Sequence, residues 1–301
     1  SGDINTSSTS ATAVRIFVNT AAGGTGSATV RNIVTGPAGT VTIQTTGLVG
    51  TGGAIRDGNG PGLLNVTTGA PGGTLFASAS TGGINLDTQV ANATLSVNSG
   101  TGTLGAINVR NTQFALTVTS PPPTTTTNGS IAISNNNDIT ATTLIAGGTN
   151  ANVSITTTTG APNKNLIVGT VTATGDSVTL NATGTINDTG AAVPPNAISS
   201  RALTMVAGDG IGTSSTLNVD VDTMNARTTV GGINVTDSDD LIVTGATASA
   251  GNIAITTATV ANADLTINGP VSTAAGGTIT LTFGEDLFLN FGGLIQSDTG
   301  D

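Results

Sequence analysis

Aspartate is the residue whose number and spacing could do chemistry in this sequence. Sixteen of the seventeen acidic residues are Asp, and Glu285 is the only glutamate. Acidic turns rich in oxygen suit the flexible coordination of Ca²⁺. The sequence therefore predicts a calcium site in the acidic segment 209–240, with a solvated acidic surface as the alternative. The candidate ligands are Asp209, Asp220, Asp222, Asp237, Asp239 and Asp240.

Charge is distributed unevenly along the 301 residues. Residues 1–150 have a net charge of zero, and residues 151–301 carry the whole net charge of −10. Carboxylates that stack on neighbouring strands repel one another, and a divalent cation would remove that repulsion. We expect calcium to stiffen the second half of the chain or to cross-link molecules. With 7 basic residues and 2% aromatic residues, nucleic acid is a poor partner.

Several catalytic chemistries are excluded by composition. The chain has no Cys and no His, so it can form neither a disulfide nor a Ser-His-Asp triad. Gly175-Asp176-Ser177 is interpreted as a turn, because the other parts of a nucleophile motif are missing. The acid pairs Asp239-Asp240 and Glu285-Asp286 have no basic residue within ten positions. The sequence predicts that the protein is not an enzyme and has no cofactor other than calcium.

A short pattern, apolar-x-apolar, recurs along the chain and is often preceded by Gly at position −2. Its spacing varies from 20 to 30 residues with a mean of about 24, which is typical of solenoids. The sets start at Val41, Leu64, Ile84, Ile107, Ile131, Val153, Val178, Leu203, Ile233, Ile253 and Ile279.

This alternation predicts two or three short strands per repeat, because period-2 patterning places the aliphatic residues on one face. A helix is disfavoured by 43 Gly, 10 Pro and many β-branched residues. The period favours an all-β fold, a parallel β-helix with coils of about 24 residues, and the alternative is a series of tandem β-sandwich repeats. The residues expected to point inward are Ile131, Ile133, Ile253, Ile255, Ile279 and Leu281.

One solenoid segment, 1–301, is expected to form a single domain. Breaks in the pattern predict loop excursions from it. They lie near 120–128, 160–165, 187–200 and 206–230.

Two stretches resemble the repeats of filamentous-haemagglutinin-like proteins and autotransporter passengers of bacteria. They are GNIAITTATVANADLTINGPVSTAAGGTITLTF (251–283) and TNGSIAISNNNDITATTLIAG (127–147). The resemblance covers most of 39–295 and lies in the pattern, not in one motif. It implies a right-handed parallel β-helix in a secreted or surface-displayed protein with an adhesive, matrix or surface-coat role.

Together these observations predict a structural protein of the extracellular space or cell surface, with no membrane span. The partners expected are a second copy stacked end to end, a longer parent chain, or surface glycans and host ligands. The alternative is a carbohydrate-binding or carbohydrate-cleaving β-helix. Eight Asn-x-Ser/Thr sequons predict a glycoprotein in a host with the required transferase. They are Asn5, Asn65, Asn92, Asn128, Asn152, Asn181, Asn187 and Asn234.

Overall fold

The protein is built from parallel β-strands in two compact units, Ser1–Ile155 (unit 1) and Thr156–Asp301 (unit 2). A single segment was expected from the repeat. The described part of the chain contains strands and no helix, and so no helix that could cross a membrane. The computed structural model describes residues 3–18, 25–45, 53–97, 105–119, 129–148, 151–158, 163–190, 197–258, 263–274 and 276–298.

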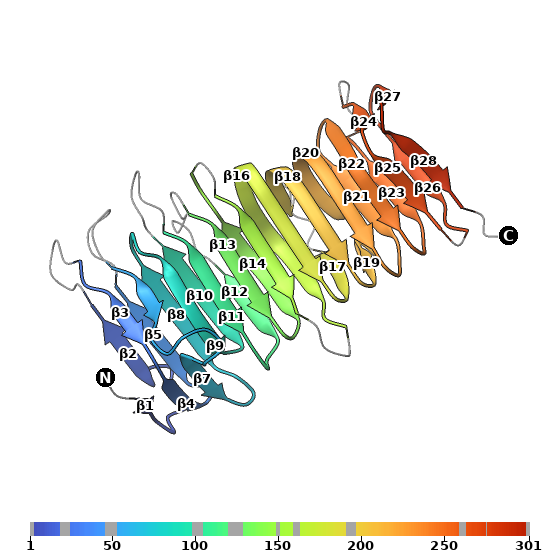
Figure 1. The fold of residues 1–301 in the computed structure, drawn as a ribbon. Helices are drawn as coiled ribbons and strands as arrows, with labels where there is room; N and C mark the ends of the chain where they lie inside the picture. The colour runs from blue at the N-terminus through green and yellow to red at the C-terminus, as the bar shows by residue number, and fades with distance from the viewer. Residues whose placement is uncertain are drawn as a thin grey trace. The chain divides into compact units, whose positions relative to one another are not determined.

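Unit 1 consists of three ladders of stacked strands, seen from blue to green in Figure 1. Within each ladder, a strand pairs with the strands of the coils before and after it. The first ladder contains β1 (Ile4–Asn5), β4 (Ile33–Pro37) and β7 (Val66–Gly69). The second contains β2 (Val14–Phe17), β5 (Thr40–Gln44), β8 (Thr74–Ala79), β10 (Asn92–Val97), β12 (Leu116–Thr119) and β14 (Ile139–Ile145). The third contains β3 (Ala28–Val30), β6 (Ile55–Asp57), β9 (Ile84–Gln89), β11 (Ile107–Asn111), β13 (Ile131–Asn135) and β15 (Val153–Thr157), and the division between the units falls within β15.

Unit 2 is also built from ladders of parallel strands, several of them longer than those of unit 1, and is drawn from yellow to red in Figure 1. The long β16 (Leu166–Ala182) contributes to two ladders, because its start pairs with β17 and its remainder with β18. One ladder continues through β17 (Thr185–Asp188), β19 (Gly210–Ile211), β21 (Ile233–Asp237), β23 (Ile253–Thr256) and β26 (Ile279–Thr282). The other continues through β18 (Ile198–Ala207), β20 (Leu217–Thr228), β22 (Leu241–Ala248), β24 (Leu265–Ile267), β25 (Pro270–Thr273), β27 (Leu287–Leu289) and β28 (Leu294–Ser297).

The repeat of about 24 residues is the length of one coil. Ile84, Ile107 and Ile131 lie opposite one another on successive strands, 23 and 24 residues apart. Ile233 and Ile253 stack in the same way in unit 2. The predicted all-β parallel solenoid is therefore confirmed, and the sandwich alternative is wrong, because sandwich strands pair antiparallel within their sheets.

The alignment of four predicted repeat starts is corrected by the strand register. Val41 stacks between Val14 and Leu75 in the second ladder, not with Ile84. Val178 pairs with Leu203, and both lie in the ladder of β18, not in that of Ile233. Leu64 precedes β7 and is only half-buried. Every strand of a coil carries the same aliphatic alternation, so the pattern marks strands without saying which ladder a strand joins.

Aliphatic side chains fill the interior of each unit, as the alternation predicts. Ile131 and Ile133 expose 1% and 2% of their surface, and Ile253 and Ile255 expose none. The predicted inward residues Ile279 and Leu281 are only half-buried. They lie on β26, which pairs with β23 through one edge, and no described strand covers its other edge.

The recurrent Gly at position −2 belongs to a tight turn before the strand. Gly231 and Gly251 have φ values of +70° and +91°, which favour glycine over residues with a Cβ. A Cβ at Gly231 would overlap the carbonyl oxygen of Asp209, and one at Gly251 would lie 2.7 Å from the amide nitrogen of Gly232. Glycine therefore allows the turns of successive coils to stack closely.

A line of buried polar residues runs through unit 1 at paired positions of β9, β11 and β13. The Thr88 hydroxyl donates to Asn111 Oδ1 (2.9 Å), and Asn111 Nδ2 donates to Asn135 Oδ1 (3.2 Å). Asn135 Nδ2 in turn donates to the carbonyl of Phe114 (2.9 Å). Asp237 occupies the corresponding last position of β21 in unit 2, where a carboxylate takes the place of an amide.

The expected loop excursions have different outcomes. The segment 120–128 lies outside the described residues, as do 160–162 and 191–196. The segment 206–230 is not a loop, because it contains the end of β18, all of β19 and all of β20. Val219 and Val221 alternate with Asp220 and Asp222 there, so the acidic run belongs to a strand whose valines are buried and whose aspartates lie on its outer face.

Candidate functional site

Four of the six predicted calcium ligands form one acidic group in unit 2. Asp220 and Asp222 lie on β20, Asp237 ends β21, and Asp239 follows in the next turn. Their electrostatic interactions link Asp239 to both Asp220 and Asp237, and Asp222 to Asp220.

The other two candidates have their own partners. Both carboxylate oxygens of Asp209 accept hydrogen bonds from Asn163 Nδ2, at 2.9 and 3.0 Å. Asp240 Oδ1 accepts the backbone N–H of Asp264 at 2.8 Å. The prediction thus located an acidic group. It also included Asp209 and Asp240, whose carboxylates instead bind Asn163 and the backbone of Asp264.

Asp237 is fully buried and links the backbone of strand β20 to that of the turn after β21. Its Oδ1 accepts the N–H of Asp239 at 3.0 Å, and its Oδ2 accepts the N–H of Val221 at 3.2 Å. Burial, with the adjacent Asp239 carboxylate as a smaller contribution, raises the pKa of Asp237 to about 8. Around neutral pH this group therefore holds a proton for much of the time.

Asp220 also has a raised pKa, but it is only half-buried. Partial burial raises its pKa, and the nearby charges of Asp239 and Asp222 act in the same direction. Among the described residues, no three acidic side chains lie close enough together to hold a metal ion.

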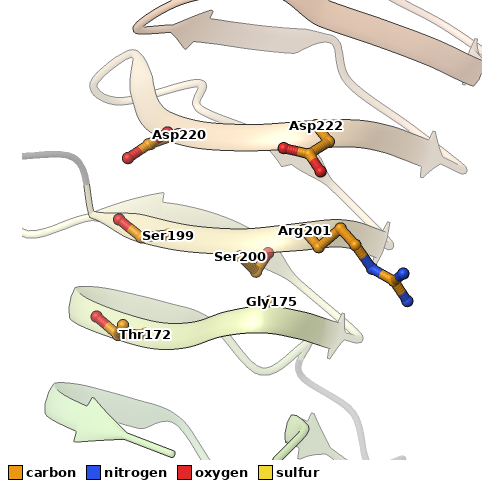
Figure 2. Close-up of a pocket in the computed structure, with 7 residues that line it drawn as sticks. All are labelled: Thr172, Gly175, Ser199, Ser200, Arg201, Asp220 and Asp222. Carbon is orange, nitrogen blue, oxygen red and sulfur yellow. The ribbon is translucent and has the colours of Figure 1, made fainter. Parts of the chain in front are cut away.

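An open polar groove of about 430 Å³ lies over β16, β18 and β20, and two members of this acidic group line it. Figure 2 shows Thr172, Ser199 and Asp220 following one another on the three successive strands, with Arg201 extending away from Asp220. The register agrees, because Ser199 pairs with both Thr172 and Asp220. The groove is lined by Thr172, Gly175, Ser199, Ser200, Arg201, Asp220 and Asp222.

The groove forms where the strands shift the phase of their alternation. On β18 the buried residues are Ile198 and Ser200 and then Leu203, so Arg201 and Ala202 both lie on the outer side. Strand β20 repeats this shift after Val221, so that Asp222 and Thr223 both lie on the outer side before the buried Met224. On β16 the register to β18 slips between Ala173 and Ser177, and Gly175 lies in the slip with a φ of +79°. The groove lies at this register slip, on the outer face of the sheet next to Arg201.

Arg201 differs from the other arginine that faces carboxylates across strands. In unit 1, Arg110 Nε forms an ion pair with Asp87 on the neighbouring strand. The Arg201 guanidinium makes no ion pair with any residue that the structure describes. Strict alternation back from Leu203 would have placed Arg201 inside the core, which explains why the sequence did not single it out. The sequence contains one sign of this shift: the buried residues Ser200 and Leu203 are three positions apart, whereas strict alternation would place them two apart.

Comparison with known proteins adds nothing to this geometry. No protein-family model, no curated protein and no solved structure matches the chain. Function must therefore be inferred from the fold and from the groove.

Calcium remains a prediction for the acidic group. If the ion binds the folded protein alone, calcium at ten times its Kd should add about 1.4 kcal/mol to the free energy of unfolding. Melting temperature and particle size, followed by calorimetry and light scattering, should rise in millimolar calcium and reverse with chelator. An equal response to sodium chloride at the same ionic strength would show that the carboxylates are only a screened surface.

Proposed function

We propose that this chain is a structural, non-catalytic segment of an extracellular or cell-surface β-solenoid protein, of the filamentous-haemagglutinin-like or autotransporter-passenger type. Its role is to extend an adhesin, a matrix fibre or a surface layer by adding coils. The absence of Cys, the low charge of 8% and the resemblance of its repeats to those secreted proteins support the location. One structural observation supports the role.

That observation is the open ladder in unit 2. Leu265, Ile267 and Val271 are fully buried on β24 and β25. Their partners in the next coil, Leu287, Leu289 and Ile295, expose 39%, 57% and 39% of their surface. These residues continue an interior ladder but lack a covering coil among the described residues. Such an edge offers unpaired backbone groups together with aliphatic side chains, which is a template for a further strand.

A further coil would cover this edge, supplied either by a longer parent chain or by the first described coil of unit 1 in a second copy. This first coil has a hollow of about 150 Å³ whose lining includes Ile4, Ile16 and Val18. Arg15 and Arg31 lie on this coil, whereas Glu285 and Asp286 lie on the open coil of unit 2. An aliphatic hollow with basic residues and an aliphatic edge with acidic residues are complementary, which supports end-to-end stacking of copies.

Replacing Ile295 with lysine should interrupt this assembly. Ile295 pairs with the buried Val271, so the ammonium group would be placed in the dry centre of the new contact. We expect association to weaken by about tenfold or more, equivalent to at least about 1.4 kcal/mol. Sedimentation velocity and light scattering over a concentration series would measure the change.

The matched control is Gln296→Lys, which adds the same charge to the next residue of β28. Gln296 pairs with Ser272, on the alternate face of the ladder. This variant should assemble as the unchanged protein does. A protein that remains monomeric at its highest soluble concentration, or two variants that behave alike, would contradict end-to-end stacking.

A further inference from the structure

The groove over β16, β18 and β20 presents polar groups that have no described partners. The side chains of Thr172, Ser199, Arg201, Asp220 and Asp222 form no hydrogen bond or ion pair with the described residues. Ser200 differs, because it is 7% exposed and its hydroxyl donates to the carbonyl of Ala202 at 3.2 Å. The groove therefore combines two hydroxyls, two carboxylates and one guanidinium, all available to a ligand.

This lining restricts the chemistry of the ligand. None of the described residues that line the groove has a large apolar or aromatic side chain, so a hydrophobic molecule would find little apolar surface to bury there. Two carboxylates outnumber the single guanidinium, so a polyanion would be repelled. The acidic side chains among the described residues do not converge on a metal position.

A hydroxyl-rich neutral molecule satisfies all of these groups. Adjacent hydroxyls of a sugar ring can donate to Asp220 and Asp222, whose charged oxygens only accept hydrogen bonds. Sugar oxygens can accept from the Arg201 guanidinium, which only donates. The Thr172 and Ser199 hydroxyls can do either, and they lie in line with Asp220 across three strands (Figure 2).

We propose that this groove is a binding site for a neutral saccharide, held by Asp220, Asp222 and Arg201 and aligned across the strands by Thr172 and Ser199. Its volume of about 430 Å³ falls in the range of ligand sites, about 300–1,000 Å³. The open groove lies along the outer side of a sheet, so it admits part of a longer glycan chain. This activity is additional to the structural role and does not depend on end-to-end stacking.

The test is a titration of the 301-residue protein with neutral oligosaccharides, galacturonate oligomers and chitosan oligomers, followed by calorimetry and saturation-transfer NMR. We expect a neutral oligosaccharide to bind. Arg201→Ala and Asp222→Asn should each weaken that binding by about tenfold or more, because each removes a charge-assisted hydrogen bond. Both side chains are exposed, so the melting temperature of these variants should stay close to that of the unchanged protein.

The matched controls are Arg227→Ala and Asp3→Asn, which remove the same charges at exposed positions outside the groove. Saccharide binding should be unchanged in both. Three results would overturn the proposal: no neutral saccharide binds at millimolar concentration, the groove variants bind as tightly as the controls, or only the chitosan or galacturonate oligomers bind.

Discussion

Replacing Ile255 with aspartate is expected to unfold its coil. Ile255 is fully buried on β23, between Val235 of β21 and Leu281 of β26. The substitution removes a large aliphatic side chain and leaves a carboxylate among aliphatic neighbours, which should cost about 3–5 kcal/mol or more. Because solenoid coils stabilise mainly their neighbours, hydrogen exchange should accelerate most in β21, β23 and β26.

The control for this prediction is Ala254→Asp on the same strand. Ala254 lies at the alternate position and is half-buried on the outer side, so its carboxylate can reach water. Urea denaturation should show a much smaller loss of stability for this variant. Equal losses at positions 254 and 255 would contradict the inward orientation of Ile255.

Asp237 should make unit 2 less stable as the pH rises from about 4 to about 8. The pKa of this carboxyl is about 8 in the folded protein and 3.8 as its ordinary value. Between those values the folded state binds the proton more tightly, so stability is greatest below the lower value and is lost as the pH approaches the upper one. The slope contributed by one such group is at most about 1.4 kcal/mol per pH unit. Denaturation at several pH values would measure it.

Asp237→Asn should flatten this pH dependence. The amide cannot ionise, and it occupies the position that Asn111 and Asn135 fill in unit 1. The groups that face Asp237 are the carboxylate of Asp239 and the amide of Val221. Asp286→Asn, an exposed change elsewhere in unit 2, should retain the slope of the unchanged protein. A slope that survives Asp237→Asn would show that another group titrates.

Much of the fold could be predicted from aliphatic alternation and its period. Ile107 and Ile131 are spaced by one coil and stack as expected, because the period-2 pattern and the turn glycines both act locally. The ladder to which each strand belongs could not be predicted, as Val41 and Val178 show. All ladders bury the same residue types, so their identity depends on turn lengths, which vary from coil to coil.

For the candidate site, the sequence predicted which acidic residues would take part, but it did not predict Arg201 or the burial of Asp237. Asp220 and Asp222 were identified as candidate ligands from the acidic segment, and the structure places them on the outer side of β20. Arg201 was missed because its strand shifts phase between Ser200 and Leu203. The burial of Asp237 was missed for a related reason: the last residue of β21 still points inward, although it lies next to a turn.

The stacking of Ile84, Ile107 and Ile131 in unit 1 has a consequence for how such a chain can evolve. Unequal recombination between two coils would add or remove one coil's length of sequence. The new neighbours would again present aliphatic residues opposite aliphatic residues and turn glycines next to turn glycines. In a globular domain the same event would destroy the core. Here recombination can add or remove whole coils, and the coils that remain keep their cross-section.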